Sequence, residues 1–127
     1  MARTGSVINK TSGRQLLDHV QWCSSFACKL RGLMFRRALP AGSGLLLVEG
    51  QSSRANTAVH MMFMSFPIAV IWLDDDFRVV DKRYAAPWRP FCVPSQPARY
   101  TLEANAELLE CVEVGDELVW QASDGKG

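Results

Sequence analysis

The sequence lacks any apolar run long enough to cross a bilayer or to act as a secretion signal. A membrane-spanning helix needs about 18 or more consecutive apolar residues. The longest candidates here, 45–48 and 59–73, are too short or are interrupted by His60, Ser65 and Pro67. The N-terminal residues MARTGSVI also lack the apolar core of a signal peptide. These absences predict a cytoplasmic protein with no membrane partner.

An excess of charge of one sign is also missing. The 127 residues carry 14 Lys and Arg against 13 Asp and Glu, a net charge of +1, and this balance argues against a general nucleic-acid binder. The hydrophobic fraction of 48% and the charged fraction of 21% are those of an ordinary globular protein. We expect a single domain over residues 1–127, with a core of about residues 5–121 and a frayed tail over 122–127.

The common catalytic and metal-binding signatures are absent. The sequence has no GxGxxG, no Walker loop, no HExxH, no CxxC and no GxSxG. The four cysteines would fit two disulfides in a secreted protein, but in a cytoplasmic protein we expect reduced thiols. Cys23 and Cys28 stand five residues apart, and no His or Cys pair elsewhere completes a zinc pattern. The sequence therefore predicts no metal site and no cofactor.

The hydrophobic pattern predicts short strands separated by turns. We expect strands at 6–10, 15–22, 45–48, 68–73, 77–84, 99–103 and 118–121. Within 99–103, Tyr100 and Leu102 face one side of the strand, and Thr101 and Glu103 face the other. The segment 49–57 is polar and shows no periodicity.

One or two helices accompany these strands. Ser24 or Ser25 can cap a helix that continues to Met34, because four apolar residues recur at helical spacing. These residues are Phe26, Leu30, Leu33 and Met34. A second short helix is predicted over 104–111. The expected class is α+β, mainly β: a compact, barrel-like antiparallel sheet with one or two short helices.

The most unusual segment is His60–Pro67, with the sequence HMMFMSFP. His60 is one of only two histidines, and it can act as a base or serve as a hydrogen-bonded residue at a strand edge. The three methionines allow three interpretations: core packing, an adaptable apolar binding surface, or thioether ligands for Cu(I). Core packing is the interpretation that the sequence favours.

Five landmarks in order resemble a known family. They are Arg31-Gly32-Leu33-Met34-Phe35, Gly44–Val48, His60 with Met64–Asp74, Ala98–Glu103, and Val114-Gly115-Asp116. The chain resembles the conserved domain of unknown function 192 over roughly residues 5–121. The resemblance implies a compact, mainly β, barrel-like domain and supplies no reaction, because the family has no established one. Family members usually carry Asp where this chain has Ala69, and Gly within the stretch 104–107.

These features favour a non-catalytic binding module with an apolar pocket or rim built from segments 31–35 and 60–67. The predicted ligand-binding residues are Arg31, His60, Met64, Pro67 and Arg99. No catalytic residue is assigned. The expected partner is an unidentified small molecule or a protein, with no nucleic acid, and the chain is a monomer or a homodimer. An interaction or scaffold domain is the alternative, and an enzyme using His60 or a cysteine is the third hypothesis.

Overall fold

The computed structural model describes residues 3–25, 28–29, 32–33, 37–61, 63–88 and 91–123. These residues form seven strands and one short 3-10 helix. The elements are β1 (Arg3–Asn9), β2 (Arg14–Cys23), β3 (Ser43–Ser53), β4 (Ile68–Leu73), β5 (Val79–Ala85), β6 (Ala98–Asn105), η1 (Ala106–Cys111) and β7 (Leu118–Ala122). The mainly β architecture predicted from the sequence is confirmed.

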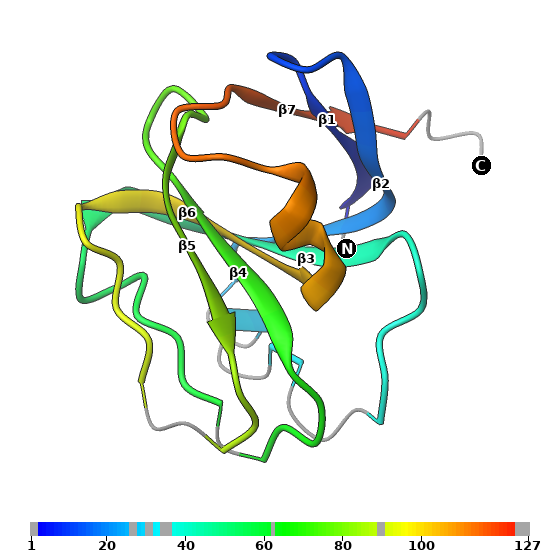
Figure 1. Ribbon diagram of the computed structural model, residues 1–127. Helices are drawn as coiled ribbons and strands as arrows, with labels where there is room; N and C mark the ends of the chain where they lie inside the picture. Colours follow the sequence, from blue (N-terminus) through cyan, green and yellow to red (C-terminus); the bar gives the residue numbers. More distant parts are fainter. Residues whose placement is uncertain are drawn as a thin grey trace.

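All seven strands belong to one curled sheet, in the order β5-β4-β6-β3-β2-β1-β7. Neighbouring strands are antiparallel except β2 and β3, which run parallel. The two edge strands approach each other at one end, where Arg78, just before β5, pairs with Glu117, just before β7. The N–H of Leu118 donates to the carbonyl of Phe77 at 2.9 Å at this junction. The sheet therefore curls into a half-closed barrel, as Figure 1 shows.

One face of the sheet encloses the interior of the barrel. Alternate residues of β4, namely Ala69, Ile71 and Leu73, point to this face, as Leu102 of β6 does. The helix η1 packs on β4 and β5 and contributes Leu108 to this core. The buried members of this barrel core are Val7, Leu17, Val20, Leu46, Ala69, Ile71, Leu73, Val79, Tyr100, Leu102, Ala104, Leu108, Val112 and Leu118.

The opposite face is covered by the long connections between strands. Ile68, Val70 and Trp72 of β4 point to it, because side chains alternate along a strand. In Figure 1 these connections gather at the lower end of the sheet. The buried apolar members of this loop-covered core are Cys23, Leu33, Leu39, Leu45, Val59, Met61, Met64, Ile68, Val70, Trp72, Ala85, Cys92 and Ala98.

The structure corrects several details of the sequence-based prediction. The sheet is not wholly antiparallel, since β2 and β3 are parallel. Strand β3 continues through the polar stretch to Ser53, because Ser53 pairs with Ala98 of β6. The second predicted helix is the 3-10 helix η1, and most of the first predicted helix lies outside the described residues.

The expectation of reduced cysteines is wrong for two of the four. Cys23 and Cys28 form a disulfide, whereas Cys92 and Cys111 are free thiols. Both disulfide partners pack in the loop-covered core, Cys23 fully buried and Cys28 partly so. Cys23 ends β2, and the chain turns back there, which brings two residues only five apart in sequence within bonding distance.

None of the helices in the described ranges has the length and apolar character needed to span a bilayer. Of the predicted frayed tail, residues 124–127 lie outside the described part of the chain, and Ala122 belongs to β7.

Candidate functional site

A buried carboxyl group marks the candidate site. Glu103 lies in the middle of β6, pairs with Leu45 of β3 and Val70 of β4, and is only 5% exposed. No hydrogen bond or ion pair holds its carboxyl group among the described residues. Burial raises the pKa of Glu103 to about 7, because the charged form loses its hydration there. A carboxyl group near half-ionisation inside an apolar layer is unusual for a purely structural residue.

The Glu103 side chain faces a small cavity. Its volume is about 70 Å³. Among the described residues, every side-chain nitrogen or oxygen atom that is fully inaccessible to solvent has a hydrogen-bond partner. The Glu103 carboxyl has no such partner, so its oxygens must be accessible from this cavity. We call it the Glu103 cavity; its lining residues are Lys29, Gly32, Leu33, Leu47, Ala58, Val59, His60, Met61, Met64, Ile68 and Glu103.

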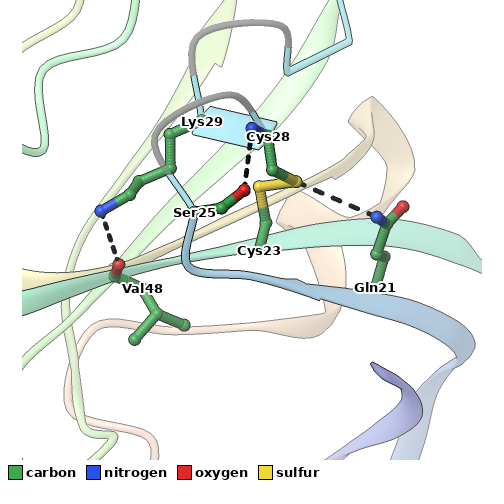
Figure 2. The surroundings of a disulfide bond; sticks show 6 residues. All are labelled: Gln21, Cys23, Ser25, Cys28, Lys29 and Val48. Carbon is green, nitrogen blue, oxygen red and sulfur yellow. Dashed lines mark hydrogen bonds between the residues drawn. A yellow bond between two sulfur atoms is a disulfide. The ribbon is translucent and has the colours of Figure 1, made fainter. Parts of the chain in front are cut away.

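The first wall of the cavity comes from the segment after β2. Ser25 Oγ accepts a hydrogen bond from the Cys28 N–H at 3.1 Å, the arrangement of a helix N-cap, which agrees with one of the two predicted capping residues. Lys29 Nζ then donates to the carbonyl of Val48 at 3.0 Å and to Glu49 Oε1 at 3.2 Å. Figure 2 shows the disulfide and the Lys29–Val48 bond holding this turn against the sheet. The turn therefore has two attachments, one covalent and one polar.

The second wall comes from the connection between β3 and β4. The indole N–H of Trp72 donates to the carbonyl of Thr57 at 2.7 Å, which ties this connection to β4. Val59 then pairs with Cys92, and Met61 accepts a hydrogen bond from the Trp88 N–H at 2.8 Å. These bonds hold the connection from which His60 and Met61 line the Glu103 cavity.

Two bulky residues that hydrogen bonds or sequence connect to the lining residue Met61 have an unusual backbone conformation. Phe63 and Trp88 both adopt φ of 65°, which is unusual for bulky side chains. Their rings meet edge to face, with centroids 5.2 Å apart, and they are 48% and 54% exposed. Phe91 nearby in the sequence is 68% exposed.

The structure brings together two of the five predicted ligand-binding residues. His60, exposed at the rim, and Met64, buried, both line the Glu103 cavity. Pro67 is half-buried just before β4 and does not line it. Arg99 lies elsewhere, with Nε donating to the carbonyl of Glu49 at 3.0 Å and the guanidinium 5.3 Å from the Tyr100 ring centroid. Arg31 lies outside the described residues.

Ala69, the position at which the family resemblance implies an Asp, is on the other face of the sheet from the cavity. Ala69 is fully buried in the barrel core, whereas His60 lines the cavity on the loop-covered side. Because neighbouring residues of a strand point to opposite faces, an acid at position 69 would not face His60. The Glu103 cavity therefore does not involve the side chain at position 69.

Sequence reasoning missed Glu103 as a site residue. It placed Thr101 and Glu103 correctly on one face of the strand, but a charged residue usually marks a solvent-facing position. The alternating pattern of β6 could have indicated the burial of Glu103 only together with the strand pairing. In the sheet, Glu103 lies beside the buried residues Leu45 of β3 and Val70 of β4 and points to the same face. That pairing is not visible in a single segment.

A second hollow is larger but less suited to a specific ligand. It has a volume of about 490 Å³ and is lined by residues of β1, β2 and β7 together with Phe77. Its charged group, Arg3, already lies over the Trp22 and Trp120 rings, 5.1 and 5.0 Å from their centroids. This hollow is an open aromatic groove whose cation is engaged.

The described residues do not assemble a conventional metal site. No three His, Cys, Asp or Glu side chains within these ranges come together in a metal-binding group. The disulfide also removes Cys23 and Cys28 as nucleophiles, and Cys92 is buried. The Glu103 cavity is therefore a hollow with one acid at its floor, apolar walls, and a histidine at its mouth.

The fold and the site together define a small, half-closed β-barrel domain with a cavity under its connecting loops. Comparison with known proteins identifies the family. Residues 7–120 match the model of domain of unknown function 192 (DUF192), described as an uncharacterised ACR, and the chain belongs to this family.

Relatives of similar size carry names that state no activity. The chain is 36% identical over 122 residues to a UPF0127 protein of Thermococcus gammatolerans, covering 94% of this chain and 78% of the relative. It is 37% identical over 116 residues to UPF0127 protein PF1050 of Pyrococcus furiosus, covering 90% and 97%. A crystal structure from Sinorhizobium meliloti 1021, provisionally described as a transcription regulator, superposes with a TM-score of 0.81 at 23% identity, covering 94% of each chain. At that identity the likeness shows the fold alone.

Proposed function

We propose that this chain is a non-catalytic binding module that takes a small ligand into the Glu103 cavity. The observation that carries the proposal is a buried carboxyl with no hydrogen-bond or ion-pair partner among the described residues, facing a cavity with otherwise largely apolar walls. Ligand sites are typically apolar hollows with a few convergent polar groups, and this cavity has that composition. Its walls include residues from both segments, 31–35 and 60–67, that the sequence analysis associates with binding.

The cost of burying Glu103 supports a role in ligand binding rather than in stabilising the fold. An unpaired polar group in an apolar interior lowers stability, and replacing it with an apolar residue is often neutral or stabilising. A binding function accounts for a group that folding alone disfavours. His60, exposed at the rim, supplies a second polar contact for the part of the ligand that extends out of the cavity.

The test is an NMR titration with small fragments of different charge. We expect at least one charge class to shift the backbone amides of Leu33, Met61 and Glu103 in the wild-type protein. Ala58→Leu places a larger side chain at the cavity wall and should abolish these shifts, whereas Ala55→Leu, at an exposed position of the same connection, should preserve them. If no cationic, neutral or anionic fragment shifts the cavity amides, the proposal is wrong.

An interaction module is the second candidate, and one observation favours it. Phe63 and Trp88, whose rings meet edge to face, and Phe91 expose large parts of their rings. Exposed aromatic side chains that gather on one face favour association. The expected occupant is a second copy of the chain, and sedimentation velocity over a hundredfold range of concentration measures it. A monomer at every concentration rejects this candidate.

A further inference from the structure

We infer that the Glu103 cavity binds a primary alkylammonium group. This inference rests on the proposed function and adds the chemical class of the ligand. The ammonium would donate hydrogen bonds to the Glu103 carboxylate, and its short alkyl stem would lie against the methionine and aliphatic walls. The group can belong to a small free amine or to the end of a longer diamine.

The first argument is the state of the carboxyl group. Glu103 is 95% buried, since its residue exposure is 5%. Within the described chain it has no hydrogen-bond donor and no cation as a partner. A carboxylate in such surroundings gains most from a ligand that brings both positive charge and N–H donors, because charge-assisted hydrogen bonds are the strongest kind.

The second argument is size. A cavity of about 70 Å³ is roughly half the volume of the ~150 Å³ apolar cavity that accommodates benzene. About three or four non-hydrogen atoms therefore fit, as in ethylammonium or propylammonium. Guanidinium compounds with a bulky stem and aromatic amines exceed this volume.

The third argument concerns the charged and titratable side chains of the described residues that line the cavity with Glu103. Lys29 also lines the cavity, but its Nζ already contacts Glu49 Oε1 at 3.2 Å and the Val48 carbonyl at 3.0 Å. The Lys29 charge is thereby compensated by Glu49 and does not repel an incoming cation strongly. His60 also lines the cavity, but its side chain is exposed to solvent at the rim.

Metal ions fit the lining less well. Ca²⁺ and Mg²⁺ require about six or more oxygen ligands, and Glu103 supplies the one carboxyl group among the lining residues described. Zinc requires three or four His, Cys or carboxylate ligands, and no such group is present in the described ranges. The alkyl walls formed by Leu33, Leu47 and Ile68 instead match an alkyl stem.

Binding of an alkylammonium ligand to Glu103 should weaken as the pH falls. Burial raises the pKa of Glu103 to about 7, so the carboxylate that would hold the ammonium is largely present at pH 8 and nearly absent at pH 5. We expect affinity for ethylammonium to fall roughly 100-fold from pH 8 to pH 5. A ligand this small should bind with a Kd of roughly 0.1–1 mM at best.

The experiment is an NMR titration of the intact chain with ethylammonium chloride at constant ionic strength. Ethanol serves as the neutral control, and tetramethylammonium serves as a cation without N–H donors. Butane-1,4-diamine distinguishes the two sources, since tighter binding than ethylammonium indicates the end of a longer diamine. Glu103→Gln should reduce ethylammonium affinity at pH 8 at least tenfold, and Glu110→Gln, which removes an exposed carboxylate elsewhere, should leave it unchanged.

Ethylammonium binding at pH 8 that is lost in Glu103→Gln and weakened at pH 5 supports the inference. The same binding in Glu103→Gln as in the wild type overturns it. Cavity-amide shifts with ethanol or anions but not with ethylammonium also overturn it while leaving the proposed function standing. Specific binding of Cu(I) or Zn²⁺ at these amides, without ethylammonium binding, replaces it with a metal site.

Discussion

Two buried polar residues, Asn9 at the barrel edge and Glu103 on the loop-covered side, differ in how their hydrogen bonds are completed. Asn9, fully buried at the edge of the barrel, donates to Asp116 Oδ2 at 2.8 Å and accepts from the backbone N–H groups of Thr11 and Ser12. Glu103, beneath the connecting loops, has no hydrogen bond among the described residues. Asn9 thus completes its polar contacts within the protein, whereas the Glu103 carboxyl completes none with the described residues.

The barrel core and the loop-covered core also differ in the residue types they contain. The barrel core consists of buried aliphatic and aromatic residues contributed chiefly by strands. The loop-covered core adds a disulfide, two methionines, a free thiol and a buried acid. One face is thus suited to stability, and the other combines packing with a small cavity.

The largest expected effect comes from the barrel core. Leu102→Ala removes a fully buried side chain and should lower the free energy of unfolding by about 4 kcal/mol. Met64→Ala, beside the existing cavity, should cost about 2 kcal/mol, because part of its surroundings is already open. Urea denaturation at pH 7 measures both. An equal or larger loss in Met64→Ala would contradict the division between the two cores.

The second largest expected effect is a gain in stability in Glu103→Gln, and its size depends on pH. Burial raises the Glu103 pKa from 4.5 in the unfolded chain to about 7 in the folded protein, so the folded state binds the proton more tightly. The stabilising contribution is complete below pH 4.5 and is lost as the pH rises through 7. Glu103→Gln should therefore be more stable than wild type by about 3 kcal/mol at pH 8 and equally stable at pH 4.

Thermal or urea unfolding at the two pH values checks this prediction. Glu107→Gln provides the control for the change in net charge, because Glu107 is exposed on η1. A Glu103→Gln variant less stable than wild type at pH 8 would show that the carboxylate has a stabilising partner in the protein.

The disulfide should contribute a smaller amount. Replacing both Cys23 and Cys28 with Ser frees a short loop in the unfolded chain and should lower stability by about 2 kcal/mol. Adding a reductant to the wild-type protein should produce a similar loss, and the double variant should not respond. Stability of the wild type that is independent of reductant would mean that the bond contributes nothing.

The smallest effect concerns the Lys29–Glu49 pair. Lys29→Met should cost about 1 kcal/mol, because both side chains are largely shielded, at 25% and 18% exposure. Lys10→Met, which removes the more exposed pair with Glu117, should change stability by less than about 0.5 kcal/mol. Equal losses in the two variants would mean that Lys29 does not anchor the cavity wall.

Local pattern was sufficient to predict much of the fold. The first hairpin and the strand 68–73 were predicted because turn residues and β-branched runs act within short segments. The parallel pairing of β2 with β3 and the extension of β3 to Ser53 were not predicted, since both depend on a neighbouring strand far along the chain. The family membership came from the order of several weak motifs.

The candidate site was predicted only in part for the same reason. His60 and Met64 were identified because the segment HMMFMSFP is unusual in composition. Glu103 was not, because its burial results from a connection about 40 residues earlier that folds over β6. Arg99 was predicted to bind a ligand, but the structure places it beside Glu49 and Tyr100.

The most direct test of the account is a titration of the Glu103 side-chain carboxyl by carbon-13 NMR, with and without ethylammonium. The account predicts an apparent pKa of about 7 in the free protein and a lower pKa when the ammonium is bound, because the cation favours the carboxylate. A pKa near 4.5 in the free protein would show that the carboxyl is not held in an apolar cavity. A raised pKa that ethylammonium leaves unchanged would contradict the assigned ligand.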